Sequence, residues 1–306
     1  MGLRFEGVYS ALVTPMTAEE EVDHETLCDF ANFLVEEGGV QGLIPLGSTG
    51  EYYALTDQER EAVVKTTLEV AAGRVPVLVG TNGGGTRQIV AYCRQAEALG
   101  AAGLLLAAPY YSLPTSDELY RHFKVVNDAV GIPIMLYNYP GRTGVDMKPD
   151  LIERLAELKN IQYVKESTGD ATRVSEIIRR CGERIAVFCG CDTLALESFM
   201  MGAVGWVGGV VNALPKAHVQ LFELAVGKKD IFAARELYYK MLPVLALTEG
   251  AGQYTQFVKA ACALSGHPVG PPRKPLWPAG EQDVNQLKEL LVSFEATSSS
   301  RSRCAG

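Results

Sequence analysis

The sequence predicts an α/β fold, a (β/α)₈ TIM barrel with a C-terminal three-helix extension, on three observations. Short apolar runs alternate with longer amphipathic stretches over most of the chain. The apolar runs show little alternation of polar and apolar residues, which is typical of parallel strands buried on both faces. The links are short, which favours a closed barrel over an open doubly wound sheet, whose glycine-rich fingerprint does not follow the first run.

Eight strands and eight helices can be placed from this pattern. The predicted strands are residues 7–14, 42–46, 75–80, 103–107, 133–138, 163–166, 185–190 and 205–210. The predicted helices are residues 24–37, 57–72, 86–99, 116–129, 149–158, 172–180, 193–201 and 216–226. Thr56, Ser116 and Thr193 are predicted helix caps, and Thr56 with Glu59 three residues later forms the best capping box.

After residue 226 the apolar spacing is helical only. Three further helices are expected, over residues 229–247, 253–265 and 283–295. We therefore divide the chain into a catalytic barrel (1–226), a helical extension (227–296) and a disordered tail (297–306), which is rich in Ser and Arg. The sequence leaves open whether the extension packs on its own barrel or also forms subunit contacts.

The composition excludes several classes of protein. Of 306 residues 47% are hydrophobic and 21% charged, and the net charge of −8 argues against a broad nucleic-acid or anionic-membrane surface. No apolar run reaches the roughly 18 residues of a membrane helix, and the N-terminus lacks a signal-peptide pattern. Seven cysteines without disulfide spacing predict reduced thiols and a cytoplasmic protein. No cluster of ligand residues predicts a metal, and Cys189 with Cys191 fits two small buried side chains better.

Lys165 is the most informative candidate for chemistry, because residues at the carboxyl ends of barrel strands face the active site. It lies in the apolar run IQYVKES. Burial lowers the pKa of a lysine, which leaves a neutral amine able to attack a carbonyl carbon. The alternatives are a lysine that reaches solvent at the strand end, or one paired with a carboxylate. The sequence alone does not separate these.

Other polar side chains follow neighbouring strands. Tyr137 ends the fifth strand at the depth of Lys165 and could relay protons, although core packing alone is the better explanation of a tyrosine there. Ser48 and Thr49 lie in the loop GSTGE, where backbone N–H groups freed by its glycines could bind a carboxylate; an ordinary turn is the alternative. Arg142 follows Pro-Gly and suits bidentate carboxylate binding, or is a solvated loop arginine.

Taken together, these motifs resemble the dihydrodipicolinate synthase and N-acetylneuraminate lyase family of class I aldolases. The resemblance extends from about residue 5 to residue 295. It is carried by GSTGE (47–51), PYY (109–111), YNYPGRTG (137–144) and KEST (165–168), and by the spacing from Tyr137 to Lys165. Each motif is weak alone, and their combination is specific. The resemblance implies a barrel enzyme that forms a Schiff base with pyruvate and needs no metal or organic cofactor.

The resemblance also implies roles for single residues. Lys165 would form the imine, and Tyr137 would relay protons together with Ser48 and with Tyr111, which in the synthases comes from a neighbouring subunit. This sharing implies a homo-oligomer, a tetramer built as a dimer of dimers.

Four residues are assigned to substrate binding on the same basis. The loop at Ser48 and Thr49 would hold the pyruvate carboxylate, and Arg142 matches the arginine that binds the carboxylate of aspartate semialdehyde. Gly47 and Val207 complete the substrate-binding set.

The second substrate is less well defined, because the chain departs from the synthase pattern. Ser48 is the variant common among lyases, Tyr139 replaces a common Val, and residues 249–253 lack the usual Asn-Pro. Tyr52 and Tyr53 replace small residues of the lysine feedback pocket, which predicts weak or absent lysine inhibition.

The leading expectation is condensation of pyruvate with aspartate semialdehyde, a step of lysine biosynthesis, because the neuraminate lyases lack an arginine at position 142. The alternatives are a catabolic lyase or dehydratase of a 2-keto-3-deoxy sugar acid or related 2-keto acid, and a barrel that binds a keto acid without turnover.

Overall fold

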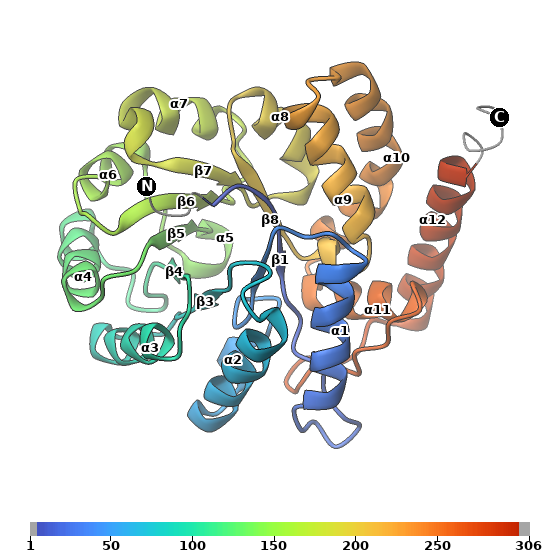
Figure 1. Cartoon of the computed structure of the whole chain (residues 1–306), viewed down its shortest axis with the longest axis horizontal. Helices are drawn as coiled ribbons and strands as arrows, with labels where there is room; N and C mark the ends of the chain where they lie inside the picture. Colours follow the sequence, from blue (N-terminus) through green and yellow to red (C-terminus); the bar gives the residue numbers. More distant parts are fainter. Residues whose placement is uncertain (1–4, 300–306) are drawn as a thin grey trace.

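The computed structural model describes residues 5–299, whose eight strands run parallel around a barrel (Figure 1). The strands are β1 (Gly7–Ala11), β2 (Gly42–Ile44), β3 (Leu78–Gly80), β4 (Gly103–Ala107), β5 (Ile134–Asn138), β6 (Ile161–Glu166), β7 (Ala186–Cys189) and β8 (Gly205–Gly208). They pair in the order β2-β1-β8-β7-β6-β5-β4-β3. A parallel bridge between Leu43 and Val77 joins the two ends of this order, so the barrel closes and the predicted fold class is confirmed.

Helices surround the barrel (Figure 1), and α10, α11 and α12 follow it. The α-helices are α1 (His24–Glu36), α2 (Asp57–Ala71), α3 (Thr86–Ala98), α4 (Ser116–Ala129), α5 (Pro140–Thr143), α6 (Pro149–Leu155), α7 (Thr172–Cys181), α8 (Ala195–Met200), α9 (Pro215–Phe222), α10 (Ile231–Gly250), α11 (Tyr254–Leu264) and α12 (Glu281–Ser299). Short 3₁₀ turns are η1 (Tyr52–Ala54), η2 (Gly182–Arg184), η3 (Asp192–Leu194) and η4 (Val210–Asn212), and η5 (Glu223–Gly227) is a π-turn.

The helix caps follow the expected chemistry, with two corrections. The capping box of Thr56 with Glu59 is confirmed. Helix α4 is capped by Thr115 and not by Ser116, because Glu118 lies three residues after Thr115 and completes a second box. Thr193 does not cap α8: it lies in η3, and its hydroxyl and amide both donate to Glu249. A distant carboxylate therefore replaces the local cap.

Two apolar layers stabilise the barrel. The inner layer fills the barrel with alternate strand residues, among them Tyr9, Met135, Tyr163, Phe188 and Val207. The outer layer packs the remaining strand side chains against the helices. Because successive strand residues face opposite sides, the residue two places after inward-facing Tyr163 also faces inward. That residue is Lys165.

The C-terminal helices pack on their own barrel. The Tyr238 hydroxyl of α10 donates to the carbonyl oxygen of Thr193. Helix α12 continues to Ser299, so residues 297–299 of the predicted disordered tail are helical, while residues 300–306 lie outside the described part of the chain. The division into a barrel (1–226) and an extension (227–296) stays a prediction.

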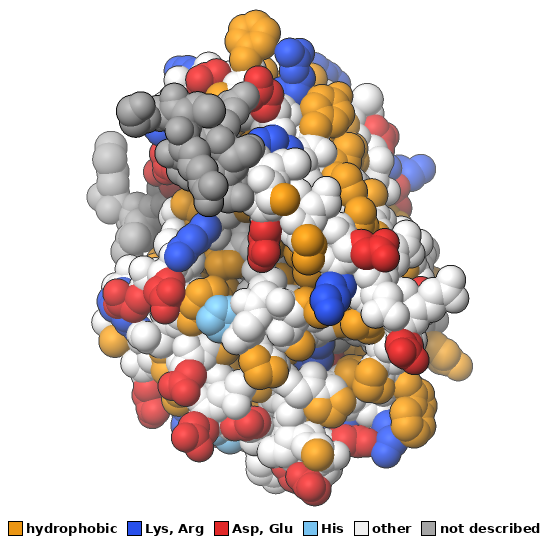
Figure 2. All heavy atoms as spheres, turned by 90° about the vertical axis from the view of Figure 1, so that its right-hand side faces the viewer, with side chains coloured by type: hydrophobic (Ala, Val, Ile, Leu, Met, Phe, Trp, Pro, Cys, Tyr) orange, Lys and Arg blue, Asp and Glu red, His pale blue; other side chains and the backbone are white. Residues whose placement is uncertain are grey.

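The face that carries the C-terminal helices shows charges of both signs. Acidic and basic side chains are interspersed there with hydrophobic ones (Figure 2). A surface that binds nucleic acid would instead gather basic side chains in one patch or stripe. Within residues 5–299, no helix has the length and apolar character needed to cross a bilayer.

Candidate active site

Lys165 lies inside the barrel near the carboxyl end of β6. The strand register places it beside Tyr137 of β5 on one side and Phe188 of β7 on the other. The residue is only 6% exposed, and its Nζ lies 4.2 Å from the centroid of the Tyr137 ring. The side chain therefore stays inside the barrel and does not extend into solvent.

The environment of Lys165 favours the uncharged amine. Burial lowers the pKa of Lys165 below its ordinary value, because the charged form loses its hydration inside the barrel. The Asp192 carboxylate is the largest influence in the opposite direction. A lysine with a lowered pKa has more neutral amine available at neutral pH, and this form attacks carbonyl carbon.

Tyr137 forms a buried wall of the cavity into which Lys165 faces. Burial raises the pKa of the Tyr137 hydroxyl above its usual value, while a hydrogen bond with Ser48 and the charge of Arg142 act in the opposite direction. The hydroxyl therefore stays protonated at neutral pH and can take part in proton relay. The ring centroids of Tyr137 and Tyr139 are 5.8 Å apart, so two tyrosines stand together on this wall.

The loop after β2 brings Ser48 and Thr49 to the same cavity. Glu51 ends the loop with φ of 55°, in the left-handed region. Within the loop, the Gly50 amide donates to the Gly47 carbonyl oxygen at 3.1 Å. The turn itself therefore uses the Gly50 amide. Carboxylate binding by other backbone amides of this loop stays a prediction.

A buried ion pair attaches this loop to the C-terminal extension. Lys259 Nζ of α11 lies 2.7 Å from Glu51 Oε1, and the two side chains are 2% and 0% exposed. Glu51 Oε2 accepts from the Arg273 amide at 2.8 Å, and Lys259 Nζ donates to the Pro271 carbonyl oxygen at 2.8 Å. The position of Ser48 thus depends on residues far along the chain.

We expect Lys259→Met to lower the free energy of unfolding by about 3–5 kcal/mol, because it leaves the Glu51 carboxylate buried without its cation. Denaturant unfolding followed by fluorescence measures this. The control is the double variant Glu51→Gln with Lys259→Met, which removes both charges and should recover part of the loss. A single variant as stable as the wild type would contradict the assigned role of the pair.

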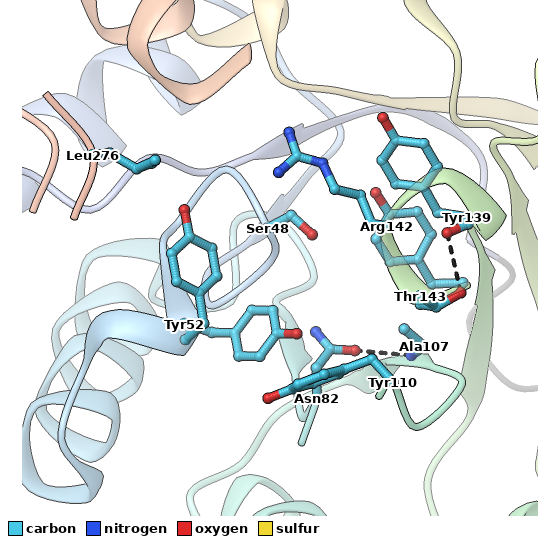
Figure 3. Close-up of a pocket in the computed structure, with 11 residues that line it drawn as sticks. Ser48, Tyr52, Asn82, Ala107, Tyr110, Tyr139, Arg142, Thr143 and Leu276 are labelled. Atoms are coloured by element: carbon cyan, nitrogen blue, oxygen red, sulfur yellow. Dashed lines mark hydrogen bonds between the residues drawn. The ribbon is translucent and has the colours of Figure 1, made fainter. Parts of the chain in front are cut away.

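A second cavity, of about 320 Å³, opens beside the first, which holds only about 30 Å³. Both are lined by Ser48, Tyr137, Tyr139 and Arg142, so these residues stand at their junction. Figure 3 shows the Arg142 guanidinium, from α5, directed toward the Ser48 loop. A guanidinium at this place suits a carboxylate that arrives through the outer cavity.

Comparison with known proteins identifies the family. The model of the Dihydrodipicolinate synthetase family matches residues 4–293. The chain belongs to this family. The family resemblance that the sequence motifs indicate is thereby confirmed, and the chain is an aldolase-type lyase.

Individual members of the dihydrodipicolinate synthetase family agree with this chain over almost its whole length. A 4-hydroxy-tetrahydrodipicolinate synthase of Syntrophobacter fumaroxidans is 38% identical, over 95% of this chain and 99% of the relative. Dihydrodipicolinate synthase from Aquifex aeolicus is 36% identical with a TM-score of 0.91, covering 95% of this chain and 98% of that chain. The chloride-inhibited dihydrodipicolinate synthase from Acinetobacter baumannii, solved with pyruvate, is 34% identical with a TM-score of 0.90, covering 95% and 99%.

Three residues assigned to the site, Tyr111, Val207 and Gly47, line neither cavity in this member of the dihydrodipicolinate synthetase family. Tyr111 is 96% exposed, with φ of 69°, and its neighbour Tyr110 lines the outer cavity instead. Val207 is buried in the inner layer of the barrel, while Gly209, two residues later, lines the inner cavity. Catalysis by Tyr111 and substrate binding by Val207 stay predictions, as does the role of Gly47.

Several lining residues were not singled out from the sequence. They are Ser167, Glu249, Tyr254 and Thr255 in the inner cavity, and Asn82 and Tyr110 in the outer one. Ser167 could have been predicted from the sequence, since it lies two residues after Lys165 and alternation along a strand places both side chains on the same face. Gly190 is needed beside it, because a Cβ at this position would lie 1.9 Å from Ser167 Oγ and 2.8 Å from Lys165 Cε.

Proposed function

We propose that this chain is a Schiff-base-forming, pyruvate-dependent aldolase, with Lys165 as its nucleophile. The observation that carries the proposal is a buried lysine of lowered pKa at the carboxyl end of β6, with the Tyr137 ring 4.2 Å from its Nζ. Membership of the family and the pyruvate complex of the related Acinetobacter baumannii enzyme support it. No organic cofactor or metal enters the proposed steps.

The chemistry follows from the amine. Neutral Lys165 Nζ adds to the ketone carbon of pyruvate, and loss of water leaves a protonated imine. Tyr137 and Ser48 move the protons that this exchange needs. The protonated imine withdraws electrons, so a methyl proton of pyruvate is lost and an enamine forms. The enamine attacks an aldehyde, and water then releases the product and the free amine. The reverse sequence cleaves a 2-keto-4-hydroxy acid.

For the second substrate we propose aspartate semialdehyde, which makes the enzyme a 4-hydroxy-tetrahydrodipicolinate synthase and a contributor to lysine biosynthesis. Arg142 stands between the two cavities and supplies a cation for the carboxylate of this aldehyde. Relatives that carry the synthase name, two of them at 38% and 36% identity, support the same substrate.

One observation favours a second candidate, a lyase or dehydratase of a 2-keto-3-deoxy sugar acid. The outer cavity, of about 320 Å³, offers more room than a four-carbon aldehyde needs, and it is lined by polar groups of Tyr52, Tyr110 and Asn82. Hydroxyl and amide groups of this kind can bind the hydroxyls of a longer substrate.

A substrate panel separates the two candidates. Purified protein is assayed for condensation of pyruvate with aspartate semialdehyde, and for pyruvate release from 2-keto-3-deoxy sugar acids. The proposal predicts condensation at a kcat/KM well above that for any sugar acid. Cleavage of a sugar acid without reaction of aspartate semialdehyde would overturn the synthase assignment and leave the Schiff-base assignment standing.

Arg142→Ala is expected to weaken binding of the second substrate and to leave binding of pyruvate nearly unchanged. Loss of a charged hydrogen-bonded contact costs about 1.5–3 kcal/mol, so KM for aspartate semialdehyde should rise roughly tenfold to hundredfold. Steady-state kinetics with each substrate varied in turn measure this, and KM for pyruvate should change little. Arg142→Lys is the matched control, since it keeps the charge and loses the bidentate geometry. An unchanged KM for the aldehyde would remove this role.

We also propose a homo-oligomer, with a tetramer of two dimers as its form, in the cytoplasm. Tyr111 supports the oligomer, because a 96% exposed tyrosine beside the outer cavity could enter the site of a second copy. The six cysteines within residues 5–299 are unpaired, which supports a reducing compartment. Light scattering of the purified protein tests the oligomer.

A further inference from the structure

Asp192 is a carboxyl group buried at the catalytic end of the barrel, next to the strand that carries Lys165. It begins η3, three residues past the end of β7, and is 1% exposed. Its Oδ1 accepts from the indole Nε1 of Trp206 at 2.9 Å, and its Oδ2 accepts from the Tyr254 hydroxyl. Both partners are neutral groups, so these hydrogen bonds orient the carboxylate without cancelling its charge.

Tyr254 links Asp192 to the wall of the inner cavity. The oxygen of its hydroxyl accepts from the Gly209 amide at 2.8 Å, while its proton is donated to Asp192. Tyr254, Gly209 and Lys165 line the same cavity. The strands on either side are locked in register, since the Gly190 amide after β7 donates to the Glu166 carbonyl oxygen of β6 at 2.8 Å. The Asp192 carboxylate is thus hydrogen-bonded to a side chain that lines the same cavity as Lys165.

The charges around this space are few. Burial, and secondly the nearby Glu249 carboxylate, raise the pKa of Asp192 to about 7, while Lys165 acts in the opposite direction. Glu249 reaches the site from α10 and accepts from the amides of Asp192 and Thr193 at 3.1 and 3.0 Å. The other titratable groups that influence Lys165 are Tyr139, Cys189 and Cys191. Burial raises the pKa of each of these three groups, so they are neutral near pH 7.

We propose that the Asp192 carboxylate is the counter-ion for the cation that forms on Lys165 Nζ when the imine is protonated. The proposal rests on the proposed function, because it concerns the imine of that reaction. A cation created in a buried cavity is costly unless a fixed opposite charge faces it. A preoriented carboxylate supplies this charge without reorganisation at the moment of reaction. Asp192 is therefore a positioning residue that acts on Lys165 through its charge.

The test compares a variant that removes the charge with one that keeps it. Asp192→Asn removes the carboxylate charge, and Tyr254→Phe keeps the charge but removes one of its hydrogen bonds. Asp150→Asn, on the exposed first turn of α6, is a control with the same change in net charge. Each protein is incubated with pyruvate and cyanoborohydride, which reduces the protonated imine. The rate and extent of labelling of Lys165 are measured by mass spectrometry from pH 5.5 to 10, a range chosen around the lysine pKa (~10.4 unperturbed).

The expected result is a charge effect confined to Asp192→Asn. The pH dependence of Lys165 labelling should shift by about one unit toward lower pH, because removing a negative charge lowers the pKa of Lys165 further. The fraction labelled at low pyruvate should fall roughly tenfold, since the protonated imine loses its counter-ion. Tyr254→Phe and Asp150→Asn should keep the wild-type profile. A wild-type profile in Asp192→Asn, or equal shifts in Asp192→Asn and Tyr254→Phe, would overturn the proposal. If Lys165 of the wild type is not labelled at all, the proposed function itself is contradicted.

A measurement on the wild type covers the case in which Asp192→Asn does not fold. Protein labelled with ¹³C at its aspartate carboxyls is examined by infrared difference spectroscopy near neutral pH, because burial raises the pKa of Asp192 and favours its protonated form there. Formation of the imine cation should ionise Asp192, so pyruvate should remove a band of protonated aspartic acid. An imine formed without any loss of this band would contradict the proposal.

Discussion

Lys165→Ala should abolish both the reducible adduct with pyruvate and the turnover of the enzyme. Removal of a covalent nucleophile typically costs several orders of magnitude in kcat, on the order of 10⁴ or more. The fold should survive, because a small apolar side chain then replaces a lysine in a dry barrel, although a cavity remains. Mass spectrometry after borohydride treatment and steady-state kinetics measure the two effects.

The controls for Lys165 separate its amine from its charge. Lys165→Arg keeps a cation inside the barrel but cannot form an imine, so it should be as inactive as the alanine variant. Lys159→Ala removes an exposed lysine outside the cavities and should leave activity unchanged. In the wild type, activity should rise with pH as Lys165 loses its proton, and at lower pH than an ordinary lysine allows, because burial lowers its pKa. Near-normal rates in Lys165→Ala would end the assignment.

Tyr137→Phe should reduce kcat by roughly 10²–10⁴ and change KM for pyruvate much less, because general acid–base catalysis contributes about this much. The variant keeps the ring that contacts Lys165 Nζ and removes only the hydroxyl that bonds with Ser48. Stopped-flow measurement of imine formation, with circular dichroism to follow the fold, checks both parts of this expectation.

The matched control for Tyr137 is Tyr9→Phe, which removes a hydroxyl from another tyrosine buried in the inner layer of the barrel. Tyr9 is 1% exposed, and neither cavity described above is lined by it. Its loss should affect stability more than turnover. Wild-type kcat in Tyr137→Phe, or an equal loss in both variants, would show that the Tyr137 hydroxyl has no special part in proton transfer.

The sequence predicted the barrel and Lys165 because both depend on local pattern. Apolar runs mark the strands, and a lysine inside such a run is conspicuous. The alternation of strand faces also places Tyr163 and Lys165 on the same side. The helix start at Thr56 was equally local, since Thr and Glu three residues apart complete the capping box.

The residues that sequence reasoning missed arrive through tertiary packing. Glu249 and Tyr254 lie in the C-terminal helices, and only the packing of α10 and α11 against the barrel brings them to the cavity. The same helix α10 explains why Thr193 fails as a cap, since Glu249 takes its hydroxyl and amide. Tyr111 differs from these residues because its side chain is exposed. Its predicted role is in the site of a second copy of the chain, and contacts between copies do not follow from the pattern of a single sequence.

The proposed reaction depends most on the covalent bond between Lys165 and pyruvate. Wild-type protein is mixed with pyruvate, reduced with borohydride, digested and mapped by mass spectrometry. We predict one added 1-carboxyethyl group per chain, on Lys165, which appears only when pyruvate and reductant are both present. If Lys165 stays unmodified after reduction in the presence of pyruvate, and of other 2-keto acids, the proposed reaction is contradicted.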